Sequence, residues 1–243
     1  HTGYIFAPAI AISLASIAAK PSEFVKTHML LIIVNSALLL WLGSRGAVFG
    51  ILVAFVVCLV CFSEMRSIRF LSRAAFAAIS GAILSILAPL PQHGAFGALQ
   101  RFWNTSPGTA EFSSGRLSFW VEAWELIVQR PLVGYGPFQF QFVSRNAAGV
   151  FKHPHNSILQ FLFDWGMIGG LSFLVLIGLA VYAAFFTARS PSYVKLLSVM
   201  GFTTMFAYSL LDGLFFYAYP IALSIVFLAI PIATGFPWKD KFG

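Results

Sequence analysis

Long apolar segments separated by short polar connections constrain this sequence more than any other feature. Seven such segments can be marked, at 4–19, 27–42, 47–62, 74–90, 155–186, 196–211 and 219–235. Segments of this length and apolarity are typical of helices that cross a bilayer. Charged residues make up 9% of the chain, whereas an average soluble domain has roughly 25%. The sequence therefore predicts an all-α, polytopic transmembrane bundle of about seven spans.

The apolar segments divide the chain into three regions. Residues 1–90 hold four expected transmembrane helices, residues 91–154 form a large loop, and residues 155–243 hold three further helices and a polar tail. The chain begins at His1 and enters an apolar segment directly. We therefore expect that membrane helices which precede this segment in the whole protein are missing.

The basic residues report the topology. Nine of the 15 Lys and Arg residues fall in the connections 20–26, 64–73 and 189–195 and in the tail. In a seven-span bundle these four stretches share one side, which the positive-inside rule makes cytoplasmic. Arg45, the large loop and His155 then face the periplasm. The net charge of +7 is thus a topology signal, and we expect membrane lipids and no nucleic acid as partners.

The large loop is rich in aromatic residues, which predicts that it is ordered. Within it, Arg116–Gln129 is expected to be an amphipathic helix that lies on the membrane surface or caps the bundle. Its predicted apolar stripe consists of Leu117, Trp120, Val121, Trp124, Ile127 and Val128, with Glu122, Glu125 and Gln129 off that stripe.

A polar stretch with two histidines leads directly into the fifth apolar segment. Asn156 and Ser157 are good N-cap residues, so a helix should begin within a residue or two of His155. The glycines at 166, 169 and 170 permit a kink. Histidine titrates close to neutral pH, so His155 is a candidate general base that takes a proton from an acceptor hydroxyl. The alternative is an interfacial histidine that only hydrogen-bonds the loop. His153 is a weaker candidate.

His155-Asn156, then nine residues, then Gly-x-x-Gly-Gly at 166–170 resembles the pattern of the O-antigen ligases, which share a superfamily with the O-antigen and exopolysaccharide polymerases. Ser44-Arg45-Gly46 and Gly115-Arg116 are similar to further family motifs. The resemblance implies a fold like that of GT-C glycosyltransferases. It also implies that His155 activates the acceptor and that Arg45 and Arg116 bind the diphosphate of a lipid-linked donor.

Two more residues complete the candidate site. Asn156 belongs to the His-Asn pattern, and Asp212, just past the sixth segment, could orient a histidine or bind sugar hydroxyls. The sequence has no Asp-x-Asp motif and no glycine-rich nucleotide loop, so we expect no metal and no cofactor. Cys58 and Cys61 lie in an apolar segment and are interpreted as apolar packing residues.

The implied reaction is a metal-independent, inverting transfer of a glycan from an undecaprenyl-diphosphate carrier, at the periplasmic face of the bacterial inner membrane. An outer-face site fits a lipid-carried donor, because nucleotide sugars are not expected there. The acceptor is lipid A core for a ligase and a lipid-linked glycan for a polymerase. Both stay open, because Phe49 and Trp120 stand four residues after Arg45 and Arg116, where ligases often have leucine. A transporter or flippase and a structural subunit are the other hypotheses. Transporters place ionisable residues within their spans, whereas these segments are nearly free of charge.

Overall fold

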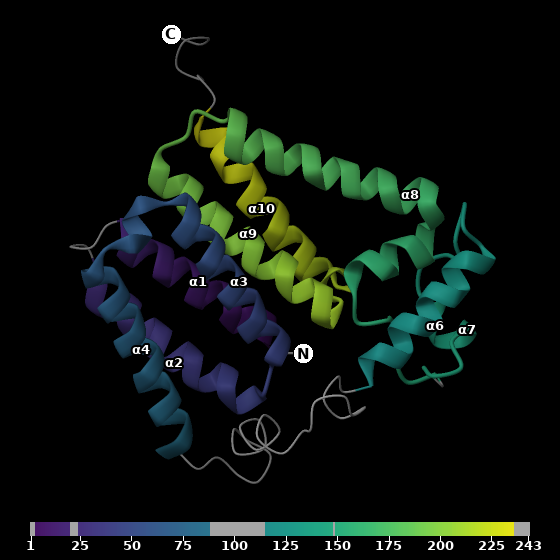
Figure 1. The fold of residues 1–243 in the computed structure, drawn as a ribbon, viewed down its shortest axis with the longest axis horizontal. Helices are drawn as coiled ribbons and strands as arrows, with labels where there is room; N and C mark the ends of the chain where they lie inside the picture. The colour runs from purple at the N-terminus through teal and green to yellow at the C-terminus, as the bar shows by residue number, and fades with distance from the viewer. Residues whose placement is uncertain (1–2, 20–23, 88–114, 148, 236–243) are drawn as a thin grey trace.

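A computed structural model describes residues 3–19, 24–87, 115–147 and 149–235, and within them all regular structure is helical. The expected all-α class is therefore confirmed for these residues. The long helices are α1 (Gly3–Ala19), α2 (Val25–Leu42), α3 (Arg45–Cys61), α4 (Ile68–Leu87), α8 (Ser157–Tyr182), α9 (Ser192–Asp212) and α10 (Ala218–Thr234). Figure 1 shows α1–α4 grouped on one side, α9 and α10 in the middle, and α8 beyond them.

Each of the seven apolar segments coincides with a long helix over the residues that the structure describes. Four of these helices are both long enough and apolar enough to cross a membrane: α2, α4, α9, and α8 together with its π-helical continuation Ala183–Thr187. Helices α1, α3 and α10 are equally apolar but have 17 residues each. The structure thus supports a membrane-spanning bundle with four clear candidate spans, and the count of seven stays a prediction.

Helix α9 is the central helix of the bundle, packed against α1, α3 and α10. Two glycines of α3 allow its backbone to approach α9 closely. A Cβ atom added at Gly50 would lie 2.5 Å from the carbonyl oxygen of Thr204, and one at Gly46 would lie 2.8 Å from the Tyr208 ring. This packing fixes the N-terminal end of α3 next to the C-terminal end of α9.

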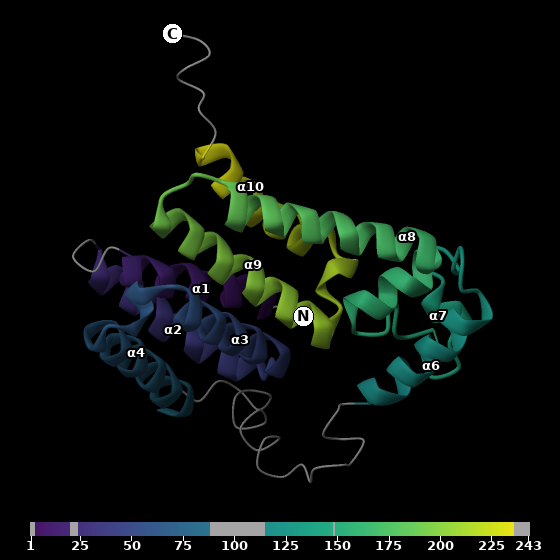
Figure 2. The same ribbon diagram turned by 45° about the horizontal axis from the view of Figure 1, so that its top comes forward.

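A sharp bend divides α8 into two limbs, as Figures 1 and 2 both show. Gly166 has φ 63° and ψ −169°, so the predicted kink is confirmed at the first of the three glycines. The segment that follows α6 fills the break: the N–H of Met167 donates to the carbonyl of Pro131 at 2.7 Å, and the N–H of Tyr135 donates to that of Phe163 at 2.8 Å. The short first limb is thereby held against the loop.

Two helices, α6 (Arg116–Gln129) and α7 (Phe140–Val143), represent the described part of the large loop. The predicted bounds of α6 are confirmed, whereas residues 91–114 lie outside the described part. The single predicted apolar stripe is wrong, because α6 has two apolar faces. Leu117, Val121, Trp124 and Val128 are exposed, while Ile127 is buried together with Phe119, Ala123 and Leu126. Glu122, predicted to lie off the apolar stripe, is also buried.

The short basic connections gather at one end of the bundle. The Ser192 hydroxyl donates to Glu64 at 2.8 Å, which joins two of them. A Cβ atom at Gly235 would lie 2.6 Å from the backbone nitrogen of Arg189, so the end of α10 lies there too. This agrees with the predicted alternation of loops. Residues 20–23 and 236–243 lie outside the described part, and the cytoplasmic assignment of this end stays a prediction.

Candidate functional site

Asp212 contacts two other predicted site residues, Arg116 and His155. It is the last residue of α9, at the end of the bundle opposite the basic connections. Its Oδ1 atom accepts a hydrogen bond from Nη2 of Arg116 at 3.1 Å and lies 3.5 Å from Nδ1 of His155. Gly213 follows in the left-handed conformation, with φ 59°, and ends the helix so that the chain can turn over the site. Three distant segments of sequence thus contribute one carboxylate, one guanidinium and one imidazole to a single cluster.

His155 has an unusual backbone conformation and is 8% exposed. Its φ of 57° is in the left-handed region, which few residues other than Gly occupy, Asn, Asp and His more often than the rest. Backbone strain of this kind is concentrated at functional sites. The ring lies between aromatic residues, with centroid distances of 6.0 Å to Phe119 and 5.7 Å to Phe151. These contacts fix the position of the imidazole ring against an aromatic wall.

Asn156 is the N-cap of α8, as its residue type predicted. Its Oδ1 accepts hydrogen bonds from the backbone N–H groups of Ile158 and Leu159, at 3.0 and 3.1 Å. The side-chain oxygen of Asn156 therefore caps the N-terminus of α8. A substrate-binding role of Asn156 stays a prediction and would involve Nδ2. Ser157 adds a second anchor, because its hydroxyl accepts from the backbone N–H of Phe215 at 3.3 Å.

His153 holds the loop in place, a role that its sequence position did not reveal. It is 3% exposed, and its Nδ1 accepts the backbone N–H of His155 at 3.2 Å. Its ring stacks on Phe216 with a centroid distance of 4.8 Å. A Cβ atom added at Gly213 would lie 2.5 Å from the same nitrogen. His153 is thus a positioning residue that fixes the strained backbone of His155, and a His-x-His spacing was the only available signal for it.

Arg45 lies at the same end of the bundle, at the first position of α3. The residues on either side of it contact Tyr208, which stands one helical turn before Asp212. The Ser44 hydroxyl pairs with the Tyr208 hydroxyl at 2.8 Å, and Gly46 faces the ring. The Tyr208 hydroxyl in turn interacts with the Asp212 side chain. Arg45 therefore lies beside the cluster around Asp212, through the contacts of Ser44 and Gly46 with Tyr208.

The cluster can accept a proton, hold an anion and orient an imidazole. Among the described residues, no three His, Cys, Asp or Glu side chains are grouped to hold a metal ion. The site is also distant in sequence from Cys58, which is buried in the bundle, and from Cys61, which is exposed on α3. A carboxylate, a guanidinium and an imidazole that meet at one point are suited to acid–base and electrostatic chemistry.

Comparison with family models gives a match over more than half of the chain. The family model described as O-antigen ligase matches residues 29–174, which include Arg45, Arg116 and the His155 pattern. No curated protein and no solved structure matches the chain significantly.

Proposed function

The chain belongs to the O-antigen ligase family, and from this membership we propose that it transfers a glycan from an undecaprenyl-diphosphate carrier to a hydroxyl of lipid A core. Members of this family are membrane proteins of the glycosyltransferase-like ligase and polymerase type. The proposed reaction takes place at the periplasmic face of the inner membrane. The observation that supports it most is the contact of Asp212 with both Arg116 and His155.

His155 is the proposed base. With Nδ1 turned toward Asp212, its other ring nitrogen, Nε2, is the atom that would take the proton from the acceptor hydroxyl. The carboxylate would keep Nδ1 protonated and stabilise the imidazolium that forms, as in serine hydrolase triads. The present separation of 3.5 Å is long for a hydrogen bond, and such contacts commonly shorten when substrate binds.

Arg116 and Arg45 are the proposed ligands of the donor diphosphate. The leaving group carries its negative charge on phosphate oxygens, so it needs fixed positive charge more than a proton. A guanidinium presents a planar fork of donors to such oxygens. Helix α3 contributes further donors, because it begins at Arg45 without a side-chain cap: the Ser44 hydroxyl is paired with Tyr208 instead.

The proposed chemistry is a single displacement. The acceptor oxygen attacks the anomeric carbon of the donor sugar while the bond from that carbon to the diphosphate oxygen breaks. The new glycosidic bond has inverted configuration, the proton moves to His155, and undecaprenyl diphosphate leaves with the bonding electrons. The charges are balanced by Arg116 and Arg45, and no metal ion is needed for this scheme.

The second candidate is a polymerase of the same superfamily, in which the acceptor is another lipid-linked glycan. Phe49 and Trp120 favour it, because leucine often stands at these positions, four residues after the arginines, in ligases. The site chemistry is the same for both, since each acceptor offers a sugar hydroxyl. The difference lies in what must dock beside His155.

Complementation separates the two candidates. The full-length protein is expressed in one strain that lacks its O-antigen ligase and in another that lacks its O-antigen polymerase. Restored attachment of glycan to lipid A core, seen as a lipopolysaccharide ladder in the first strain only, supports the ligase. Restored chain length in the second strain only supports the polymerase. Restoration in neither strain, with the protein present in the membrane, contradicts the proposal.

A further inference from the structure

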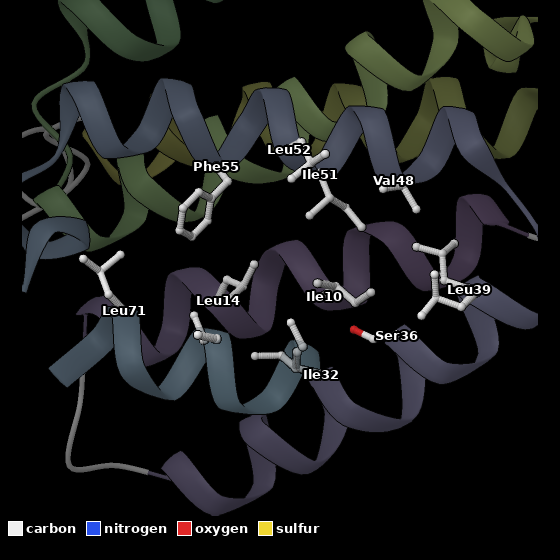
Figure 3. Close-up of a pocket in the computed structure, with 14 residues that line it drawn as sticks. Ile10, Leu14, Ile32, Ser36, Leu39, Val48, Ile51, Leu52, Phe55 and Leu71 are labelled. Carbon is white, nitrogen blue, oxygen red and sulfur yellow. The ribbon is translucent and has the colours of Figure 1, made fainter. Parts of the chain in front are cut away.

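A large apolar cavity lies among α1, α2, α3 and α4, outside the cluster around Asp212 (Figure 3). Its volume is about 520 Å³, within the roughly 300–1,000 Å³ of small-molecule sites. Among the residues that line it, Ser36 is the one with a polar side chain. A molecule that fills this cavity must therefore be apolar over the part that enters.

The cavity arises from the way the four helices pair. Helix α2 packs against α4, whereas α3 packs against α9, and α1 lies beneath both pairs. Figure 3 shows α3 on one side of the cavity, α2 and α4 on the other, and α1 between them. The wall that α4 contributes is made largely of small residues, Ala74, Ala75 and Ala78. These short side chains leave space between α4 and the facing helices.

Helix α3, which forms one wall of the cavity, begins at Arg45, a proposed ligand of the diphosphate. Val48, Leu52 and Phe55 line the cavity from α3. They follow Arg45 by three, seven and ten residues, which places all four along one side of the helix. Arg45, at the N-terminal end of that helix, lies at the end of the bundle that holds Asp212. A molecule with an apolar tail in the cavity can thus have an anionic head beside Arg45.

We propose that this cavity holds the first isoprene units of the donor's polyprenyl chain, with the diphosphate at Arg45. This inference rests on the proposed function, which supplies a diphosphate head and a long branched apolar tail on one molecule. A cavity lined by four helices would retain such a chain while the sugar is transferred. It also sets how far the diphosphate can rise toward Arg116 and His155.

A second apolar cavity provides the control. It lies between α8, α9 and α10, has a volume of about 190 Å³, and is lined in part by Ala180. Ala75→Phe adds an aromatic ring to the lining of the first cavity, and Ala180→Phe adds one to the lining of the second. Both changes add the same apolar volume to the membrane region of the protein.

The test measures binding to the full-length protein in lipid nanodiscs, with undecaprenyl diphosphate and inorganic diphosphate as probes. Ala75→Phe is expected to weaken undecaprenyl diphosphate binding at least about tenfold, with inorganic diphosphate affinity unchanged. Ala180→Phe is expected to change neither. Ala78→Leu, a smaller insertion in the same wall, repeats the test if Ala75→Phe lowers the melting temperature. Excess phosphatidylglycerol should not displace the polyprenyl probe.

Equal undecaprenyl diphosphate binding by wild type, Ala75→Phe and Ala78→Leu overturns the inference. So does weakening by Ala180→Phe alone, or displacement by phosphatidylglycerol, which would identify ordinary membrane lipid as the occupant. Glycan transfer measured on the same variants keeps the two proposals apart. If Ala75→Phe and Ala78→Leu transfer glycan at the wild-type rate and bind donor normally, the polyprenyl chain does not lie in this cavity. The proposed function is then unaffected. Absence of transfer by the wild-type protein contradicts the function itself.

Discussion

Asp212 holds Arg116 in an ion pair of 3.1 Å through the same oxygen atom that lies 3.5 Å from His155. A buried carboxylate shared by a guanidinium and an imidazole links the proposed donor ligand to the proposed base. When the diphosphate binds Arg116, the Asp212 carboxylate can form a shorter hydrogen bond with His155. Removal of the carboxylate and removal of the guanidinium should therefore have different kinetic signatures.

Asp212→Asn is expected to lower kcat at least about tenfold, because the base loses the carboxylate that orients it and stabilises its charged form. Donor affinity should stay the same or rise, since Arg116 loses its ion-pair partner. Steady-state kinetics with varied donor concentration separates kcat from KM. A large rise in donor KM at constant kcat would contradict this role for Asp212.

Arg116→Ala is expected to weaken donor binding, because a charge-assisted hydrogen bond to the diphosphate is worth about 1.5–3 kcal/mol, or roughly 10- to 100-fold in Kd. Arg116→Lys should restore only part of the affinity, since an ammonium lacks the planar fork. Equilibrium binding of undecaprenyl diphosphate measures both. Full recovery by lysine would show that charge alone matters at this position.

Gly166→Ala is expected to destabilise the protein by at least about 2 kcal/mol. The residue has φ 63°, and an added Cβ atom would lie 2.3 Å from the carbonyl of Leu132. Gly178→Ala, later in the same helix, is the matched control. Its Cβ atom would meet nothing within 4 Å, so it should be neutral or stabilising by about 0.5–1 kcal/mol. Thermal unfolding in detergent compares the two, and equal melting temperatures would contradict the observed bend.

Glu122→Gln is expected to destabilise the packing of α6 and α7 by about 1–3 kcal/mol. The carboxylate accepts hydrogen bonds from the Ser144 hydroxyl at 2.7 Å and from the backbone N–H groups of Arg145 and Asn146. Burial works against ionisation, but these bonds outweigh it and hold the pKa of Glu122 below its usual value.

The sign of the pH effect follows from that lowered pKa. The folded state prefers the ionised form, so the contribution of Glu122 is complete above its unfolded pKa of roughly 4.3. It is lost as the pH falls through the lower pKa of the folded state. As the pH is lowered from about 5 through the folded-state pKa of Glu122, the wild type should therefore lose more stability than Glu122→Gln. Parallel acid-unfolding curves for the two proteins would contradict this account.

Local pattern was sufficient to predict most helices and the break in α8. The apolar segments indicated the seven long helices, Gly115 and Pro131 marked the ends of α6, and the glycines at 166, 169 and 170 marked the region of the kink. Each of these features depends on residues that are close in sequence. The His-Asn pattern likewise placed His155 directly before the N-cap of α8.

The contacts that assemble the site could not be predicted in this way. Arg116 and Asp212 are 96 residues apart, and their pairing depends on how the loop returns to the bundle. The division of α6 into a buried and an exposed apolar face depends on which side packs against the first limb of α8. The sequence ranked His153 as a weaker candidate, because its role is to accept the backbone N–H of His155. Such a contact cannot be predicted from residue type.

The central claim, that His155 is the base of a glycan transfer from a lipid diphosphate, is tested most directly by His155→Asn. Asparagine tolerates the left-handed conformation of this residue, so the fold should be kept. The measurement is the single-turnover rate of undecaprenyl diphosphate release from a lipid-linked glycan donor, in nanodiscs with acceptor present. The account predicts a loss of about 10²–10⁴-fold, with melting temperature and donor Kd unchanged. A rate within a few-fold of wild type would contradict it.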